Sequence, residues 1–189
     1  DLEGFHQLLP HEDGPWRRNR VCGSVDGERY LLRAAAPGVT AITAWEWPTP
    51  EQWRTADAIV FNYRKKAWSA EHYAQLDAFQ ARGGGLVMFH AATIVDQEPE
   101  QLAARLGLSA QPGPTKYRHM PITLKFSAPA GHAITRGFKT IKILDEPYWP
   151  MFGDSTRVHV LATAEVDGAA RPLVWTFQPG PGRVFGSIP

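Results

Sequence analysis

The stretch Gly83-Gly84-Gly85-Leu86-Val87-Met88-Phe89-His90 decides the fold that the sequence predicts. Its three glycines end a segment with apolar residues at helical spacing, and the apolar run that follows predicts a short buried strand. That strand ends on a titratable side chain, His90. Because ligands collect at the carboxyl ends of the strands in an open parallel sheet, His90 is a candidate for the functional site. A structural histidine that only bonds a loop carbonyl is the competing interpretation.

The residues around this strand alternate between strand and helix patterns. Residues 57–63 form a continuous apolar run, which is typical of a strand covered on both faces. Ser69 precedes residues at helical spacing and Thr49 precedes Pro50, so each of them predicts the N-cap of a helix. Three further elements are predicted: a helix over 27–36, a strand over 39–45 and a helix over 99–106.

After Gly107 the pattern changes to short β-like runs separated by proline and glycine. These runs cover residues 122–126, 141–144, 158–163, 172–177 and 183–188. We expect them to add antiparallel or edge strands to the same sheet. With the strand and helix order of the first half, this predicts a three-layer α/β fold with a mainly parallel sheet and helices on both faces.

The composition is that of a single soluble globular domain. The chain has 189 residues, 43% of them hydrophobic and 21% charged, and no apolar run long enough to cross a membrane. Its 20 basic and 19 acidic residues leave a net charge of +1, which is too balanced for sequence-independent nucleic-acid binding. The single cysteine, Cys22, excludes an intrachain disulfide. A lone thiol slightly favours the cytoplasm over a secreted or periplasmic location.

A second group of candidate site residues lies in the C-terminal half. It consists of His132 and, soon after it, Asp145-Glu146-Pro147-Tyr148-Trp149. Aromatic rings stack on sugars, and carboxylates bind hydroxyls or move protons. Neighbouring residues on a strand point to opposite faces, so only one of the two carboxylates enters a given pocket, and Glu146 is favoured. A solvated charge pair beside two core aromatic residues is the alternative.

The other histidines give weaker signals. His119 begins a predicted strand and joins the candidate substrate-binding residues, although a surface histidine is the favoured interpretation. His6, His11 and Asp13 could supply ligands to a divalent metal, but their spacing matches no known metal signature. A metal therefore stays open. No nucleotide cofactor is expected, since Gly180-Pro181-Gly182-Arg183 lacks the residues of a phosphate-binding loop.

Four blocks of the sequence together resemble the ThuA-like (trehalose utilisation) family. They are, in the family's order, Gly84-Gly85-Leu86-Val87-Met88-Phe89-His90-Ala91-Ala92, Gly131-His132-Ala133-Ile134-Thr135-Arg136-Gly137-Phe138, Asp145-Glu146-Pro147-Tyr148, and Arg171-Pro172-Leu173-Val174-Trp175 with Gly180-Pro181-Gly182-Arg183-Val184-Phe185. The resemblance covers residues 56–188. It implies a flavodoxin-like α/β domain, similar in fold to class I glutamine amidotransferases, whose pocket lies beside His90.

The chain departs from these patterns in ways that bear on function. The amidotransferase nucleophile elbow carries a cysteine, whereas this chain has His90 there and its Cys22 lies elsewhere. Because a thiolate must attack the glutamine amide, we expect no glutaminase activity. The family's opening strand and the Gly-His after its last strand are missing from this sequence. The single domain over 1–189 is therefore expected to be incomplete at both ends.

The resemblance implies a carbohydrate-processing protein that acts on a disaccharide or a keto-sugar, as a hydrolase, lyase or isomerase. The residues expected to take part are His90, His132 and Glu146 in catalysis or ligation, and Asp145, Tyr148, Trp149 and His119 in substrate binding. A non-catalytic carbohydrate-binding or interaction module of a larger protein is the alternative. The expected partner is a small-molecule sugar, with no nucleic acid and no membrane, and a homo-oligomer stays open.

Overall fold

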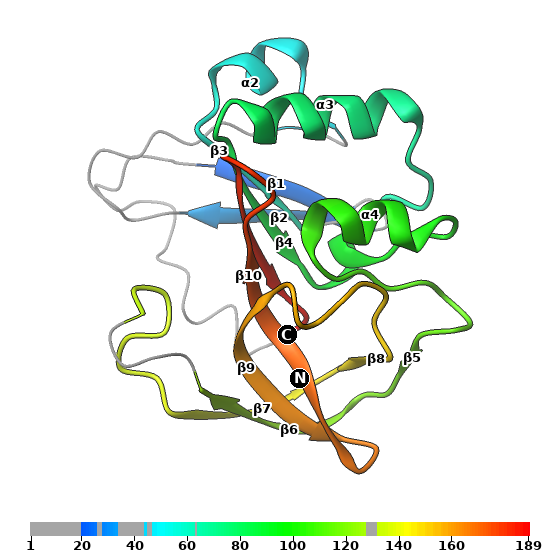
Figure 1. Cartoon of the computed structure of the whole chain (residues 1–189), viewed down its shortest axis with the longest axis vertical. Helices are drawn as coiled ribbons and strands as arrows, with labels where there is room; N and C mark the ends of the chain where they lie inside the picture. The colour runs from blue at the N-terminus through cyan, green and yellow to red at the C-terminus, as the bar shows by residue number, and fades with distance from the viewer. Residues whose placement is uncertain (1–19, 26–27, 34–43, 45–46, 63, 128–131) are drawn as a thin grey trace.

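The computed structural model describes residues 20–25, 28–33, 44, 47–62, 64–127 and 132–189 (Figure 1). Its helices are α2 (Pro50–Thr55), α3 (Ala70–Ala81) and α4 (Pro99–Leu106), with a 3₁₀ helix η1 (His90–Thr93). Its strands are β1 (Arg20–Val25), β2 (Glu28–Arg33), β3 (Ala58–Phe61), β4 (Gly85–Phe89), β5 (Lys116–Tyr117), β6 (Met120–Phe126), β7 (Thr140–Asp145), β8 (Tyr148–Trp149), β9 (His159–Val166), β10 (Ala169–Phe177) and β11 (Arg183–Ser187). No helix in these ranges is long and apolar enough to cross a membrane.

Most of the described strands form one mixed, curled sheet of seven strands in the order β3-β4-β11-β10-β9-β6-β7. β4 is parallel to β3 and to β11, and the other neighbouring pairs are antiparallel. Figure 1 shows α2 and α3 at one end of the molecule, while β6, β7 and the hairpin of β9 and β10 form the other end. The prediction of a helix-flanked, mainly parallel, flavodoxin-like sandwich is therefore wrong.

The connections between the C-terminal strands explain why the sheet is not mainly parallel. Asp167 and Gly168 alone join β9 to β10, and both have positive φ, as a tight two-residue hairpin requires. Parallel strands need a crossover of a dozen or more residues, for which such a turn leaves no room. Four of the five C-terminal runs add antiparallel strands to the same sheet, as predicted, whereas β11 lies inside the sheet and is parallel to β4.

The first half agrees with the sequence in part. β3 and β4 are neighbouring parallel strands and β4 has a partner on each side, as predicted. β3 is not covered on both faces, however, since Ala58 is exposed and only Phe61 is fully buried. Residues 28–33 form a strand paired with β1, so the helix predicted over 27–36 is wrong. The prediction failed because so short an apolar run fits the helical period and the strand period equally well. The strand predicted over 39–45 lies outside the described residues, except for Ala44.

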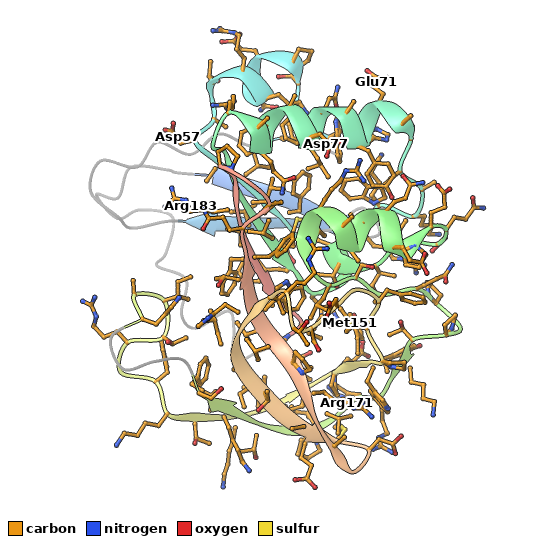
Figure 2. All side chains as sticks on the ribbon, viewed as in Figure 1. Asp57, Glu71, Asp77, Met151, Arg171 and Arg183 are labelled. Atoms are coloured by element: carbon orange, nitrogen blue, oxygen red, sulfur yellow. The ribbon has the colours of Figure 1, made fainter. Side chains whose placement is uncertain are left out.

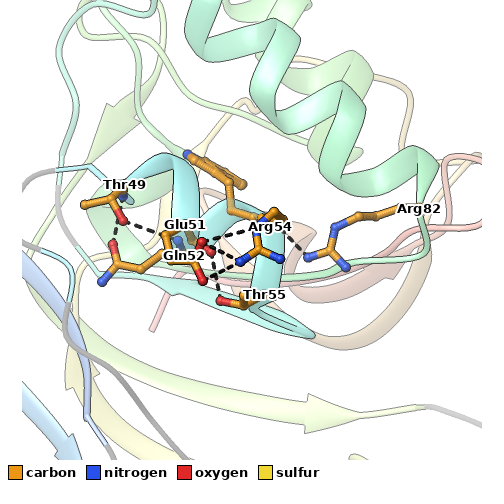
Figure 3. Close-up of polar contacts among 7 residues, drawn as sticks. Thr49, Glu51, Gln52, Arg54, Thr55 and Arg82 are labelled. Atoms are coloured by element: carbon orange, nitrogen blue, oxygen red, sulfur yellow. Dashed lines mark hydrogen bonds and ion pairs between the residues drawn. The ribbon is translucent and has the colours of Figure 1, made fainter.

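The three helices of the central segment begin and end close to the predicted residues. α2 starts from a capping box in which the Thr49 hydroxyl accepts from the Gln52 backbone N–H and the Gln52 side chain accepts from the Thr49 N–H (Figure 3). Ser69 caps α3 in the same reciprocal way through His72. Gly107 follows α4 with a φ of 89°, which favours glycine.

We expect Thr49→Ala to lower the free energy of unfolding by about 1 kcal/mol, because the first turn of α2 loses its side-chain acceptor. Urea denaturation of the two proteins measures the difference. Thr55→Ala is the matched control: its hydroxyl donates to the Glu51 carbonyl inside the helix and caps no end, so a smaller loss is expected. Equal losses for the two variants would show that the N-cap hydroxyl of Thr49 stabilises the protein no more than a hydroxyl inside the helix does.

The core lies between the helices and one face of the sheet. On β4 the side chains of Leu86 and Met88 are fully buried, whereas Val87 and Phe89 are half-buried. The helices are tied together by Gln80, which donates to the Arg105 carbonyl, and by the ion pair between Arg105 and Asp77. β4 is paired on both sides and buries Leu86 and Met88 in this core, which fixes the position of His90, the residue that follows it.

Candidate functional site

His90 stands where β4 ends and η1 begins. Its φ of 46° places it in the left-handed region, which few residues other than glycine, asparagine and aspartate adopt. A sharp, strained turn from a strand into a helix is the geometry that exposes the nucleophile in α/β-hydrolases. The backbone at His90 therefore presents the imidazole at the edge of the sheet, in the way the sequence predicts.

Both ring nitrogens of His90 are engaged. Nδ1 lies 2.6 Å from the carbonyl oxygen of Ile188, just beyond β11, and Nε2 lies 2.8 Å from the Tyr148 hydroxyl. A carbonyl can only accept, so Nδ1 carries the proton and the neutral ring accepts from Tyr148 at Nε2. The Ile188 carbonyl thus fixes the tautomer in which Nε2 is the hydrogen-bond acceptor of the ring.

One carboxylate approaches the same nitrogen. Oε2 of Glu146 lies 3.8 Å from His90 Nε2, and both side chains are about one-third exposed, at 36% and 33%. Asp145 is used differently, since its Oδ1 accepts from the Glu146 backbone N–H at 2.7 Å. The structure therefore brings Glu146, rather than Asp145, to the imidazole, and Glu146 would stabilise the protonated ring.

Tyr148 is the most buried member of this group, with 5% of its surface exposed. Burial, and then the negative charges of Glu146 and Asp145, raise the pKa of its phenol well above the ordinary value of 10.0. The hydroxyl stays protonated at neutral pH. It can donate to Nε2 of His90 while its oxygen keeps lone pairs for a ligand.

The raised pKa of Tyr148 gives a prediction for stability at high pH. A group whose pKa is raised by folding stabilises the native state below its unfolded pKa, and that stability is lost as the pH rises further. The free energy of unfolding of the wild type should therefore fall more steeply than that of Tyr148→Phe above about pH 10. Urea denaturation from about pH 8 to about pH 11 tests this.

Tyr117→Phe is the control for this experiment, because it removes a phenol that is 66% exposed. The effect of Tyr117 on the pKa of Tyr148 is the smallest of those that act on it, so this variant should nearly keep the wild-type slope. Equal slopes for the wild type and Tyr148→Phe would contradict the effect of burial on this phenol.

The remaining residues predicted after β7 lie beside this group. Trp149 is buried, donates from Nε1 to Asp167, and has the Arg118 guanidinium 5.9 Å from its ring. His119 is exposed; Tyr117 pairs with Tyr148 and Met120 pairs with Asp145, so the backbone at His119 faces Glu146 and Pro147. Trp149 and His119 thus border the cluster without a described bond to His90.

His132 lies elsewhere. Its ring stacks on His159 at a centroid distance of 5.5 Å, and its Nδ1 accepts from the Ile134 backbone N–H. His159 begins β9, which is separated from β4 by β10 and β11. Within the described part of the chain no hydrogen bond or ion pair joins His132 to His90. The structure brings together His90, Glu146 and Tyr148, and leaves His132 with a different partner.

Sequence reasoning overlooked Arg64. It follows β3 near the carboxyl edge, is half-buried, and forms an ion pair with Asp96. Its positive charge acts on Tyr148, whose pKa it lowers, against the larger effects that raise it. The signal was available, because Arg64 comes directly after the predicted strand over 57–63 and ligands collect at that edge.

The described residues offer little for a metal ion. They contain no group of three or more histidine, cysteine, aspartate or glutamate side chains placed to hold one. His6, His11 and Asp13 lie outside the described residues. A small cavity of about 140 Å³ adjoins the cluster, with Tyr148, Trp149 and Arg171 among the residues that line it.

One family model matches most of the chain. The model of the ThuA family, described as trehalose utilisation, matches residues 16–188. No curated protein matches the chain.

Solved structures show the same fold. A ThuA-like protein from Parabacteroides merdae has a TM-score of 0.65 at 18% identity, over 78% of this chain and 68% of that one. A ThuA-like protein from Bacteroides uniformis has a TM-score of 0.56 at 16% identity, over 80% and 69%. A cold-adapted β-galactosidase from Rahnella sp. R3 has a TM-score of 0.58 at 14% identity, over 78% of this chain and 22% of that one.

Proposed function

The chain belongs to the ThuA family, and from this premise we propose that it binds and processes a carbohydrate at the cluster of His90, Glu146 and Tyr148. The observation that carries the proposal is the pair of bonds at the His90 ring, to the Ile188 carbonyl and to the Tyr148 hydroxyl. With these two bonds the imidazole is neutral, and its basic nitrogen, Nε2, accepts a hydrogen bond from the buried phenol of Tyr148. Such a pair is suited to proton transfer.

The proposed chemistry is a proton relay. A sugar hydroxyl donates to the Tyr148 oxygen; as that hydroxyl loses its proton, Tyr148 passes its own proton to Nε2 of His90. The Glu146 carboxylate, 3.8 Å from Nε2, balances the charge of the imidazolium that forms. The reverse transfer returns the proton to a leaving oxygen. Hydrolases, lyases and isomerases of disaccharides or keto-sugars share these acid and base steps.

Other predicted residues have supporting parts in the proposal. Trp149 lines the cavity beside Tyr148 and offers an aromatic surface to a sugar ring, a contact worth about 1 kcal/mol. His119 and Asp145 border the cluster and could bind sugar hydroxyls. His132 takes no part in the proposed chemistry, because its ring stacks on His159.

The experiment measures binding and turnover of trehalose, sucrose and their 3-keto forms by the wild type and by Tyr148→Phe. We expect Tyr148→Phe to lower turnover by about 10²-fold or more, because the relay loses its central proton. Tyr73→Phe is the matched control: Tyr73 is also 5% exposed and has a pKa raised by burial, but it lies in the core on α3.

Two results would count against the proposal. Equal turnover by Tyr148→Phe and Tyr73→Phe would remove the relay. Binding of a sugar without turnover by the wild type would favour the alternative, a carbohydrate-binding or interaction module.

A further inference from the structure

Arg171 lies near the start of β10, in the same cavity as Tyr148. The cavity has a volume of about 140 Å³, and Trp149 and Ser155 line it as well. Figure 2 labels Arg171 on β10 and Met151, another lining residue, in the segment after β8. Because Arg171 pairs with Ala164 of β9, its backbone is held by the sheet.

The guanidinium of Arg171 has no partner among the residues that the structure describes. Its Nε is buried without a hydrogen bond, and neither a carboxylate nor a carbonyl satisfies the rest of the group. Nε of Arg64 is also buried without a hydrogen bond, but the Arg64 guanidinium forms an ion pair with Asp96, and Arg105 forms one with Asp77. Among the half-buried arginines of the described chain, Arg171 differs because it has no ion pair. A buried donor without an acceptor is costly, so its presence beside a cavity indicates a ligand that supplies the acceptor.

We propose that Arg171 binds a carboxylate on the sugar ligand, so that the site prefers sugar acids to the corresponding neutral sugars. The planar guanidinium matches a carboxylate with two parallel hydrogen bonds, one of them from Nε. This inference rests on the proposed function and deepens it. Tyr148 lines the cavity and bonds His90, so an acid held at Arg171 has its ring hydroxyls close to the relay.

The charge balance around the cavity favours a carboxylate over a phosphate. Asp145 and Glu146 both act on Tyr148, which lines the cavity, although neither carboxylate lines the cavity itself. A single unpaired guanidinium compensates one further negative charge. A phosphate dianion would bring two, and its repulsion from both carboxylates would be correspondingly larger.

The test compares glucuronate, glucose and glucose 6-phosphate by titration calorimetry with the wild type, Arg171→Gln and Arg183→Gln. In the wild type we expect glucuronate to bind about tenfold or more tightly than glucose, and more tightly than glucose 6-phosphate. In Arg171→Gln the preference of glucuronate over glucose should disappear. Arg183 is exposed at the amino end of β11, so Arg183→Gln controls for the loss of one positive charge and should keep the preference.

Each other outcome overturns the proposal. Equal binding of glucuronate and glucose by the wild type, or an unchanged preference in Arg171→Gln, shows that Arg171 holds no carboxylate. Tighter binding of glucose 6-phosphate assigns the cavity to a phosphate. In these cases, turnover of neutral sugars by the wild type would still support the proton relay of His90 and Tyr148. If none of the three ligands binds and no neutral sugar is turned over, the proposed function fails as well.

Discussion

Replacing His90 by asparagine is expected to lower sugar turnover by about 10²- to 10⁴-fold while the domain stays folded. The imidazole is the proton acceptor of the relay, and asparagine has no group that titrates near neutral pH. Asparagine tolerates the left-handed backbone that the φ of 46° requires. The side chain of His90 is 33% exposed and fills little core volume, so thermal unfolding should change little.

His72→Gln is the control for this prediction. His72 closes the capping box of α3 from its third residue, where glutamine serves equally well, and it lies outside the cluster. Turnover by His72→Gln should match the wild type. Unfolding of His90→Asn would show that His90 is a structural histidine, and unchanged turnover would remove it from the catalytic group.

The order of helices and strands around β4 could be predicted because local signals fix it. Proline and threonine start α2, serine starts α3, and glycines end α3 and α4. The arrangement of the sheet could not be predicted in the same way. Short β-like runs do not reveal which neighbours they pair with. The strand and helix order of the first half suggested a mainly parallel sheet, whereas most neighbouring strands of the observed sheet are antiparallel, as at the Asp167-Gly168 hairpin.

The candidate site was predictable where a residue follows a strand, and less so where folding brings distant segments together. His90 and the segment of Glu146 and Tyr148 were singled out from local sequence, and the structure joins them across 58 positions. Arg171 gave no signal of its own, because it directly precedes the predicted β-like run over 172–177, where an arginine is ordinarily a solvated side chain. Only the structure shows that its Nε lacks a partner.

We expect Trp175→Ala to lower the free energy of unfolding by about 3 to 5 kcal/mol. Trp175 is 0% exposed on β10, and its Nε1 donates to the Leu106 carbonyl at 2.8 Å, which ties the end of α4 to the sheet. Removing the ring leaves a cavity and an unsatisfied carbonyl. Trp175→Phe keeps most of the apolar contact, so urea denaturation should show a smaller loss. Similar losses for the two variants would mean that ring volume does not govern the effect.

A double-mutant cycle with Gly186 tests the same packing independently. A Cβ built on Gly186 would lie 2.2 Å from Cζ2 of Trp175, so Gly186→Ala alone should cost about 1 to 3 kcal/mol through overpacking. Phenylalanine lacks that part of the indole, so Gly186→Ala should cost much less in Trp175→Phe, with a coupling of about 0.5 kcal/mol or more. Thr49→Ala changes the distant N-cap of α2, so its loss of unfolding free energy and that of Trp175→Phe should simply add. If Gly186→Ala costs as much in Trp175→Phe as in the wild type, the contact between β10 and β11 is looser than the structure shows.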